Sequence, residues 1–309
     1  MSALAEASKA VDERSRIVDF IKGFSIEATP GSAAKILDYR QLIRPGTTVA
    51  VTFLPGSDFA DTVTVARRLK AEGFRPAPHF AARSIPSKAA FEDYLRRLQG
   101  EVGVEEVVAL AGALPTPLGP FESSMDLLAT GLFEKHGIRR IGVAGHPEGS
   151  PDIPAAMVAQ ALKWKNDYAA GSEAAFYVAT QFCFEAAPII AWDKAMQAEG
   201  NRLPIHIGVP GLATLKTLLG HAKACGIGNS MRLLTRQAKN VAKLLVVNAP
   251  DVLVRDLANY RAEDPRCGIR KVHMYPLGGM KKSAAWCYAV EEGAFALTKK
   301  GFELTRPID

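Results

Sequence analysis

Short apolar segments alternate with longer amphipathic segments along almost the whole chain, and this alternation restricts the fold more than any other feature. The apolar segments are rich in β-branched and aromatic residues and mostly end at Gly, Pro, Ser or Asn, which is typical of strands. The expected strands are Gly23–Glu27, Thr48–Phe53, Pro76–Phe80, Glu106–Leu110, Arg140–Ala144, Ala175–Gln181, Pro204–Ile207 and Lys271–Tyr275.

The segments between these strands have helical spacing, and several stop at a glycine. The expected helices are Asp58–Glu72, Lys88–Gln99, Ser123–His136, Pro154–Ala170, Pro188–Glu199 and Leu212–Ala224, with stops at Gly73, Gly137, Gly171 and Gly200. Repeated alternation predicts parallel strands joined by crossover helices. About eight such units close naturally into an α/β fold of the (β/α)8 TIM barrel type.

The barrel is expected to occupy residues 1–309 as a single domain, because no Pro-, Gly- or Ser-rich linker divides the chain. Residues 1–18 are polar and helix-prone and are expected to form a helical extension. The segment Ser230–Tyr260 is expected to add two extra helices before the last strand. No GxGxxG motif follows the first strand, which argues against a dinucleotide-binding Rossmann domain.

Composition excludes several classes of protein. The chain has 38 basic and 32 acidic residues, a formal net charge of +6, but its basic runs are too short for a nucleic-acid tract. The four cysteines never form a CxxC pair, and there is no HxH or HExxH, so neither a disulfide framework nor a catalytic metal is expected. Without a signal peptide or an apolar run long enough for a membrane span, we expect a cytoplasmic protein.

Polar residues stand at or just after the ends of several expected strands, where a barrel enzyme builds its site. They are Glu27, Thr52, His79, the GALPTP loop 112–117, the HPEGSPD loop 146–152, Thr180, Gln181 and His273. Histidines in such positions, here His79 and His273, are more often structural side chains than ligands. No GxSxG elbow and no recognisable cysteine nucleophile is present. The pattern therefore favours chemistry carried by a bound cofactor or by a reactive substrate.

Glu27 is the strongest candidate for a catalytic group. It follows the first strand between Ile26 and Ala28, and partial desolvation there would favour the neutral carboxyl, which can act as a general acid. The alternative is an ordinary loop or helix-capping acid. Gln181 offers both an amide donor and an amide acceptor, which suits the edge of a heteroaromatic ring. The alternative for Gln181 is a hydrogen bond that only closes the barrel mouth.

These strand ends resemble those of the methylenetetrahydrofolate reductase family, in order and at the right spacing over residues 20–295. SIEATP at 25–30 resembles the S-F-E-F-x-P of the family, and TQFCFE at 180–185 resembles T-Q-F/L-F-F-D. The other similar segments are VAVTFLPGSD at 49–58, PHF at 78–80, ALAGALP at 109–115, SMDLLA at 124–129, GVAGHPEGSPD at 142–152 and VHMYPLGGMK at 272–281.

The resemblance implies an oxidoreductase of one-carbon metabolism and methionine biosynthesis. Such an enzyme interconverts 5,10-methylenetetrahydrofolate and 5-methyltetrahydrofolate by hydride transfer through FAD, with NAD(P)H as co-substrate. The resemblance does not decide between a monomer and a homo-oligomer. Carried over by motif, Glu27 is the catalytic acid. Substrate contacts fall on Gln181, Ala113, Phe184, Leu277 and Lys281, and cofactor contacts on Thr52, His79, Leu110, Gly112, Asp126, Ala144, His146, Ser150, Lys163 and Lys165.

The departures from the family pattern gather around the implied flavin. The arginine and aspartate of R-G-D are Ala111 and Ala113 here, and the N-R of the last strand is Gly278-Gly279, with Lys281 as a substitute contact. Because Ala113 lacks the negative charge of the family's aspartate, a bound flavin should be easier to reduce, which favours oxidation of methyltetrahydrofolate. A flavin-independent relative, in which hydride passes directly from NADH, is also consistent with these losses.

Two further functions stay open from the sequence. One is a pterin-dependent methyltransferase barrel without a redox cofactor, which would be colourless and would pass a methyl group to cobalamin or a thiol. The other is a non-catalytic relative that only binds folate. Lys163 and Lys165 could likewise lie on a solvated helix face instead of meeting flavin phosphates.

Overall fold

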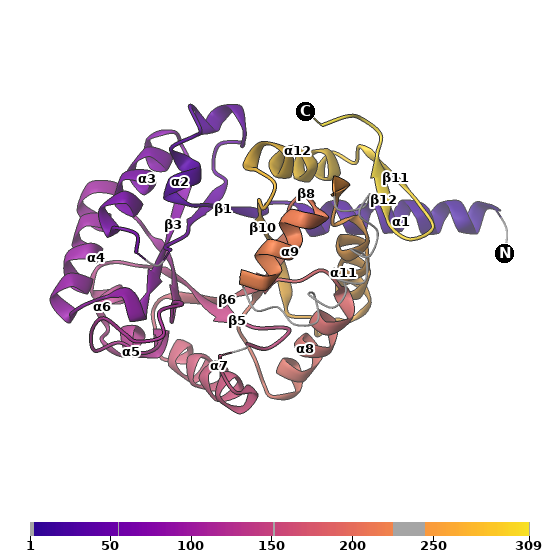
Figure 1. The fold of residues 1–309 in the computed structure, drawn as a ribbon. Coiled ribbons are helices and arrows are strands. Elements are labelled where there is room, and N and C mark those ends of the chain that lie inside the picture. Colours follow the sequence, from indigo (N-terminus) through magenta and orange to yellow (C-terminus); the bar gives the residue numbers. More distant parts are fainter. Residues whose placement is uncertain (1–2, 55, 151, 225–244, 309) are drawn as a thin grey trace. The chain divides into compact units, whose positions relative to one another are not determined.

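The computed structural model describes residues 3–54, 56–150, 152–224 and 245–308, with only the backbone at 3–11 and 222–224. Cys225 lies outside these residues. Eight parallel strands form a closed barrel in the order β1-β2-β3-β4-β5-β6-β7-β10. Figure 1 shows the strands and helices coloured along the chain. Their bounds are β1 Ser25–Ala28, β2 Thr48–Val51, β3 Arg75–Ala81, β4 Glu106–Leu110, β5 Arg140–Gly145, β6 Ala175–Phe182, β7 Ile205–Pro210 and β10 Ile269–Tyr275. The expected (β/α)8 TIM barrel is confirmed.

Helices separate the strands nearly as the spacing predicts. They are α1 Ala3–Ile21, α2 Pro30–Ala33, α3 Phe59–Ala71, α4 Lys88–Val102, α5 Ser124–Ala129, α6 Leu132–Lys135, α7 Ala155–Ala170, α8 Ala186–Ala198, α9 Leu215–Ala224, α11 Asp251–Glu263 and α12 Met280–Glu291. The expectation of one helix over Ser123–His136 is wrong. Gly131 has a left-handed φ of 65°, which a continuous helix cannot contain, so the segment forms two short helices.

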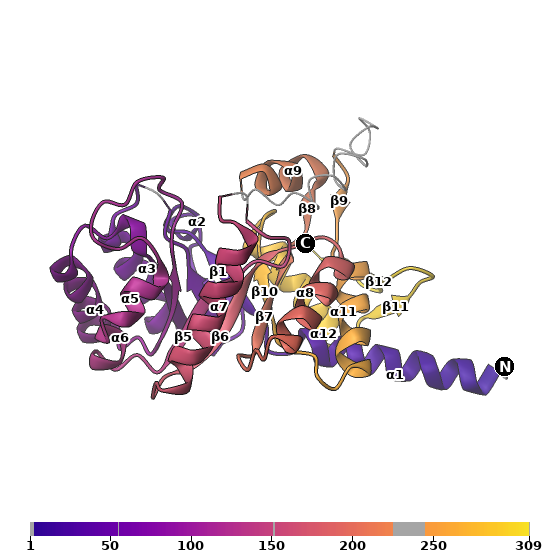
Figure 2. The ribbon, with the colours of Figure 1, turned by 90° about the horizontal axis from the view of Figure 1, so that it is seen from below.

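Two small hairpins were not expected from the sequence. β8 Ala213–Thr214 pairs with β9 Val247–Asn248, and β11 Phe295–Leu297 pairs with β12 Phe302–Leu304, both antiparallel. The segment Ser230–Tyr260, expected to add two helices, lies partly outside the described residues. Its described part contains β9 and most of α11. The hairpin β8–β9 and helix α9 project beyond the ends of β7 and β10 (Figure 2).

The chain divides into two compact units. Unit 1 comprises residues 1–24, 146–158 and 180–309, and unit 2 comprises residues 25–145 and 159–179. The strand order runs through both, and the single-domain organisation stays a prediction. Each unit has a core and a set of predicted site residues of its own.

In unit 2, successive strand residues face alternately outward to helices and inward. Phe80 of β3 packs edge-on against Phe91 of α4 and Phe133 of α6, so it faces outward. His79 and the other residues in register with it therefore face inward. Farther toward the strand starts, the inward-facing Glu106 accepts a hydrogen bond of 3.0 Å from the Tyr177 hydroxyl. Burial raises the pKa of Tyr177 well above its ordinary value, so this hydroxyl stays a donor.

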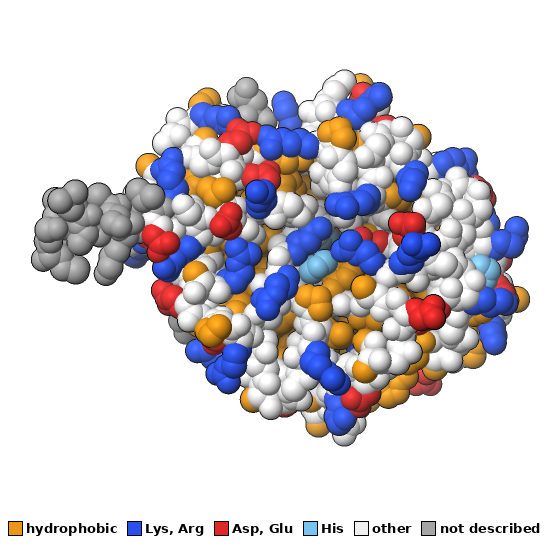
Figure 3. Space-filling model, turned by 180° about the vertical axis from the view of Figure 1, so that it is seen from behind, with side chains coloured by type: hydrophobic (Ala, Val, Ile, Leu, Met, Phe, Trp, Pro, Cys, Tyr) orange, Lys and Arg blue, Asp and Glu red, His pale blue; other side chains and the backbone are white. Residues whose placement is uncertain are grey.

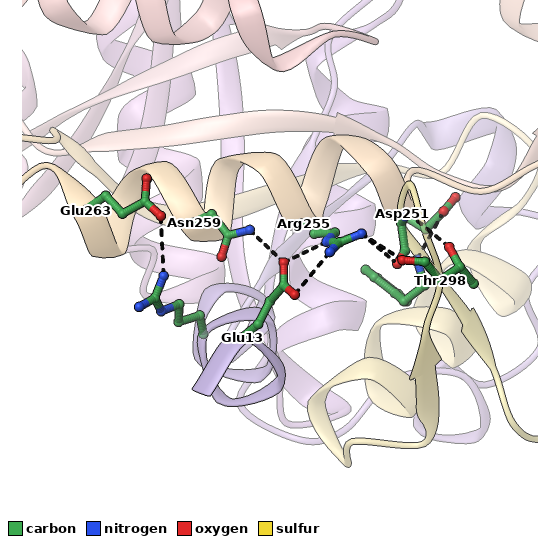
Figure 4. A network of polar contacts seen from close by, with 9 residues as sticks. Glu13, Asp251, Arg255, Asn259, Glu263 and Thr298 are labelled. Carbon is green, nitrogen blue, oxygen red and sulfur yellow. Dashed lines mark hydrogen bonds and ion pairs between the residues drawn. The ribbon is translucent and has the colours of Figure 1, made fainter. Parts of the chain in front are cut away.

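In unit 1, the N-terminal helix is part of the packed core. Ile17, Phe20 and Ile21 are essentially inaccessible to solvent, so the predicted extension 1–18 ends in a buried turn. Glu13 accepts hydrogen bonds from Arg255 and Asn259 of α11. Arg255 also donates to the carbonyl of Thr298 at the C-terminal hairpin (Figure 4). One guanidinium thus connects the first helix, α11 and the hairpin β11–β12.

Among the described residues, no helix is long and apolar enough to cross a membrane. Lys and Arg side chains are spread over the face seen in Figure 3, with Asp and Glu among them and apolar side chains between.

The close approach of Tyr177 to Gly142 predicts that Gly142→Ala is destabilising. A Cβ at this position would lie 2.7 Å from the Tyr177 ring, inside the closest contact that carbon atoms make. We expect a cost of about 1–3 kcal/mol in the free energy of unfolding, measured by urea denaturation. Gly100→Ala is the control. Gly100 lies inside α4 with no neighbouring atom within 4 Å, and this change should stabilise by about 0.5–1 kcal/mol. Equal effects at the two positions would contradict the packing.

The Arg255 network predicts a pH-dependent contribution to stability. The hydrogen bond from Arg255 holds the pKa of Glu13 below its ordinary value of 4.5, so this contribution is present above pH 4.5 and is lost as the pH falls through the lowered pKa. Arg255→Ala should cost about 2 kcal/mol at pH 7, by urea denaturation, and less once the pH has fallen below the lowered pKa of Glu13. Arg96→Ala, in an exposed pair with Asp93, should cost less than about 0.5 kcal/mol. A loss at Arg255 that does not change with pH would argue against the ion pair.

Candidate active site

Glu27 and His79 meet inside unit 2 near the C-terminal ends of β1 and β3. The imidazole Nε2 lies 3.7 Å from the carboxylate Oε1, and the side chains of His79 and Glu27 are 9% and 14% exposed. His79 faces inward because its neighbour Phe80 packs on the outer helices. A carboxyl and an imidazole in this sheltered position can exchange or hold a proton. The structure therefore brings together two of the residues selected at strand ends.

Arg83, which follows β3, holds the loop after β4 in place through three hydrogen bonds. The backbone of Arg83 donates to the carbonyl of Ala111 and accepts from Leu118, and its guanidinium donates to the carbonyl of Pro115. These bonds fix the segment that carries Gly112 and Ala113 after the last residue of β4, Leu110. Sequence reasoning missed Arg83. The stretch 107–121, which contains no charged residue, begins more than 20 residues after Arg83, so no local pattern links the two.

Thr52 follows β2 directly, and its amide donates to the carbonyl of Ala28 at 2.9 Å. Its hydroxyl is buried and has no hydrogen-bond partner among the described residues. A buried polar group without a partner is costly unless a ligand satisfies it. This hydroxyl is thus available to a bound molecule.

Lys163 and Lys165 lie on different sides of α7. Lys163 forms an ion pair of 2.8 Å with Asp167 on an exposed surface. Lys165 is 6% exposed, and its ammonium lies 3.5 Å from the carbonyl of Ala144 at the end of β5. Burial lowers the pKa of Lys165 to about 8. Of these two predicted cofactor contacts, only Lys165 points to a strand end.

Asp126 has a local structural role. Its Oδ2 accepts hydrogen bonds from the amides of Glu122 and Ser123 and from the Ser123 hydroxyl, at the start of α5. These bonds are those of a helix N-terminus with a capping box. The structure thus gives the Asp126 carboxylate partners of its own at the helix start.

In unit 1, Gln181 stands near the end of β6, beside a hydrogen-bonded framework. The hydroxyl of Thr180 accepts from the amide of Gly208 at 2.8 Å, and the hydroxyl of Tyr275 donates to the carbonyl of Thr180 at 2.8 Å. Phe182 packs edge-on against Tyr275, which in turn lies edge-on to His273. The ends of β6, β7 and β10 are fixed to one another by these contacts.

Phe184 and Leu277 lie together in the same unit. Both are partly buried and pack against Ala213, Leu215 and Leu218 of β8 and α9. The small hairpin and α9 therefore supply an apolar surface at the ends of β6 and β10. The sequence could not indicate this contact, because the hairpin joins residues far apart in the chain.

The loop after β10 explains one departure from the family pattern. A Cβ at Gly278 would lie 1.9 Å from the carbonyl oxygen of Leu212, so no side chain fits there. Lys281 lies exposed in the first turn of α12. On the loop after β5, the carbonyl of His146 accepts from Gly149 and the hydroxyl of Ser150 accepts from Asp152.

No described cysteine or metal cluster offers another kind of chemistry. Cys183, Cys267 and Cys287 are free and buried, and burial raises the pKa of the Cys267 thiol to about 11, which keeps it protonated and unreactive. Within the described part of the chain, no three His, Cys, Asp or Glu residues lie close enough together to hold a metal ion.

Known proteins resemble this chain in sequence and in fold. Methylenetetrahydrofolate reductase 2 of Saccharomyces cerevisiae is 27% identical over 205 residues, which cover 63% of this chain but only 32% of the yeast protein. The match thus spans about a third of that relative. An uncharacterized Clostridium thermocellum protein, described as binding two copies of 5-methyl-5,6,7,8-tetrahydrofolic acid, shares the fold with a TM-score of 0.52 at 14% identity. This similarity covers 87% of the present chain and 96% of the clostridial one. The methylenetetrahydrofolate reductase family matches residues 35–277, and the chain belongs to that family.

Proposed function

We propose that this protein interconverts 5,10-methylenetetrahydrofolate and 5-methyltetrahydrofolate, with Glu27 as the general acid. The observation that carries the proposal is the position of Glu27, which faces the interior at the end of β1 with a side chain only 14% exposed. Shelter from water favours the neutral carboxyl, so the group can hold a proton until the substrate needs it. Family membership supports the class of substrate.

The proton chemistry follows from the reaction. Opening the methylene bridge breaks a carbon–nitrogen bond, and the departing nitrogen must gain a proton. Glu27 supplies that proton in the reducing direction and becomes a carboxylate. In the oxidising direction the carboxylate takes the proton from the nitrogen as the bridge closes. General acid–base assistance of this kind typically contributes about 10²- to 10⁴-fold in rate.

Several residues of unit 2 suit a flavin, although the reductase family pattern around it is incomplete. The buried hydroxyl of Thr52 has no partner among the described residues, and Lys165 brings a buried amine to the end of β5. We propose that these two residues would hold FAD, with Leu110, Gly112 and Ala144 beside it. The flavin would supply two-electron hydride chemistry, with NAD(P)H as the co-substrate.

The folate would be held by residues of unit 1. Gln181 offers an amide edge to the pterin, and Phe184 and Leu277 offer an apolar surface to the aromatic part of the molecule. Lys281 is a proposed contact for a carboxylate, since it is exposed in the first turn of α12. The clostridial structure with bound methyltetrahydrofolate supports this class of ligand for the fold.

The neutral loop after β4 favours the oxidising direction. The stretch 107–121 carries no charge, and Ala113 is exposed where the family has an aspartate. Without an anion nearby, a reduced and negatively charged flavin is more stable. We therefore propose that the enzyme works at least partly in the methyltetrahydrofolate-oxidising direction, with NAD(P)+ accepting the hydride and with the methyl group supplied by a demethylation reaction.

Replacement of Glu27 tests the catalytic proposal. The purified wild-type protein should show flavin absorbance in the visible range that bleaches when 5-methyltetrahydrofolate is added. Glu27→Gln should keep the absorbance but slow the bleaching by about 100-fold or more, because the amide cannot exchange the proton. Turnover that is unchanged in Glu27→Gln would refute the acid. A colourless protein that transfers the methyl group to a thiol or to cobalamin would support the methyltransferase alternative instead.

Lys165 predicts a conflict between stability and binding. With a pKa lowered to about 8, its ammonium destabilises the ligand-free fold below pH 8, and this cost disappears between pH 8 and 10.5 as the amine is neutral in the folded protein. Lys165→Met should therefore stabilise the ligand-free protein at pH 7 by on the order of 1–2 kcal/mol in urea denaturation, with less gain at pH 10. The same change should reduce flavin content.

Lys163→Met is the matched control for Lys165→Met. Lys163 lies on the same helix and forms an exposed pair with Asp167, so its replacement should change neither stability nor flavin content by much. Equal flavin loss in both variants, or destabilisation by Lys165→Met at pH 7, would count against the assignment of Lys165.

A further inference from the structure

Glu27 and His79 are in contact although their strands are not adjacent. β2 lies between β1 and β3, and the register aligns Glu27 with Ala50 and Ala50 with Ala77, so that His79 lies two residues farther along β3, on the same face. Neighbouring strands are about 4.8 Å apart, so the backbones of β1 and β3 are separated by roughly 10 Å at this level. The 3.7 Å between carboxylate and imidazole is therefore bridged by side chains that reach toward each other across β2.

Ala50 leaves the room for this contact. As the register partner of Glu27 it faces the same side of the sheet, and it is 3% exposed. Its flanking residues on β2, Val49 and Val51, are β-branched but face the other side. A methyl group at position 50 is short enough for both side chains to pass over it, and a larger side chain would occupy the same space. The contact thus crosses β2 diagonally, between Ala50, which is level with Glu27, and the next inward-facing residue, Thr52, and the small side chain of Ala50 leaves room on the Glu27 side.

Burial makes this contact effective in fixing the carboxyl. Both side chains are less than one-sixth exposed, and electrostatic and hydrogen-bonding interactions are stronger where water is scarce. A glutamate has three rotatable side-chain bonds and otherwise loses entropy when it is held in one conformation. The imidazole therefore selects the rotamers of Glu27 in which the carboxyl points inward from the strand.

From this geometry we infer that His79 is a positioning residue for Glu27 and that Ala50 is the spacer that makes the contact possible. The inference rests on the proposed role of Glu27 as the acid. It gives His79 a second task besides the expected cofactor contact. His79 acts on the reaction through the carboxyl, by holding it where the folate nitrogen must receive or give up its proton.

The contact itself is tested in the ligand-free protein by the ring-nitrogen NMR resonances of His79, assigned with His79→Gln among the six histidines of the chain. Glu27→Gln should move these resonances, and Ala50→Val should move them in the same way, since it separates the pair while keeping both groups. Ala109→Val is the control. Ala109 is an equally buried alanine on β4 that aligns with the outward-facing Phe80, so this change should leave the His79 resonances in place. Resonances that stay in place in both Glu27→Gln and Ala50→Val would overturn the contact.

The role in the reaction is tested by a double-mutant cycle on methyltetrahydrofolate oxidation. His79→Ala should lower kcat by about tenfold, and the double variant with Glu27→Gln should be no slower than Glu27→Gln alone, because one residue acts through the other. His79→Gln, whose amide can still donate to the carboxylate, should recover part of the loss. Losses that multiply in the double variant would overturn the positioning role. If the wild type shows no oxidation at all, the acid role of Glu27 fails, while the NMR experiment still decides whether the pair and its spacer exist.

Discussion

A polar side chain in a barrel interior is costly unless it is paired, and a pair fits only where the residues beside it are small enough to leave room. Unit 2 meets this constraint twice. Near the strand starts, Glu106 accepts from Tyr177, and Gly142 leaves space for the tyrosine ring. Near the strand ends, Glu27 meets His79 across Ala50. In both cases a very small residue on one strand, Gly142 or Ala50, leaves the space in which two polar side chains from other strands meet.

The two interior pairs differ in what they are available for. The tyrosine–glutamate pair is buried near the starts of the strands and stabilises the fold. The glutamate–histidine pair lies near the strand ends, which is where barrel enzymes place their chemistry. The outward face of β3 has another task, which is packing against the helices. Phe80 packs there on Phe91 and Phe133 and holds β3 so that His79 points inward.

Lys165 shows how binding and stability can conflict in this protein. A buried amine that lies 3.5 Å from a backbone carbonyl, with its charge uncompensated, does not improve the ligand-free fold. Such a group is expected where a ligand supplies the missing charge, which is the reading proposed for a flavin phosphate. Arg255 is the contrasting case. It is also largely buried, but Glu13 and the hairpin carbonyls satisfy it, so it connects three elements of unit 1.

The sequence alone determined the eight strands, most of the helices and the family, because alternating hydrophobicity and local motifs are properties of neighbouring residues. Tertiary structure decided the rest, because it depends on residues far apart in the chain. It broke the segment Ser123–His136 at Gly131, where the backbone adopts a left-handed conformation, and it placed the hairpin β8–β9 against Phe184 and Leu277. It also buried Lys165 while leaving Lys163 exposed on the same helix, and it placed the Asp126 carboxylate in a helix cap. The contact of Glu27 with His79 across Ala50 depends on strand register, which no single strand encodes by itself.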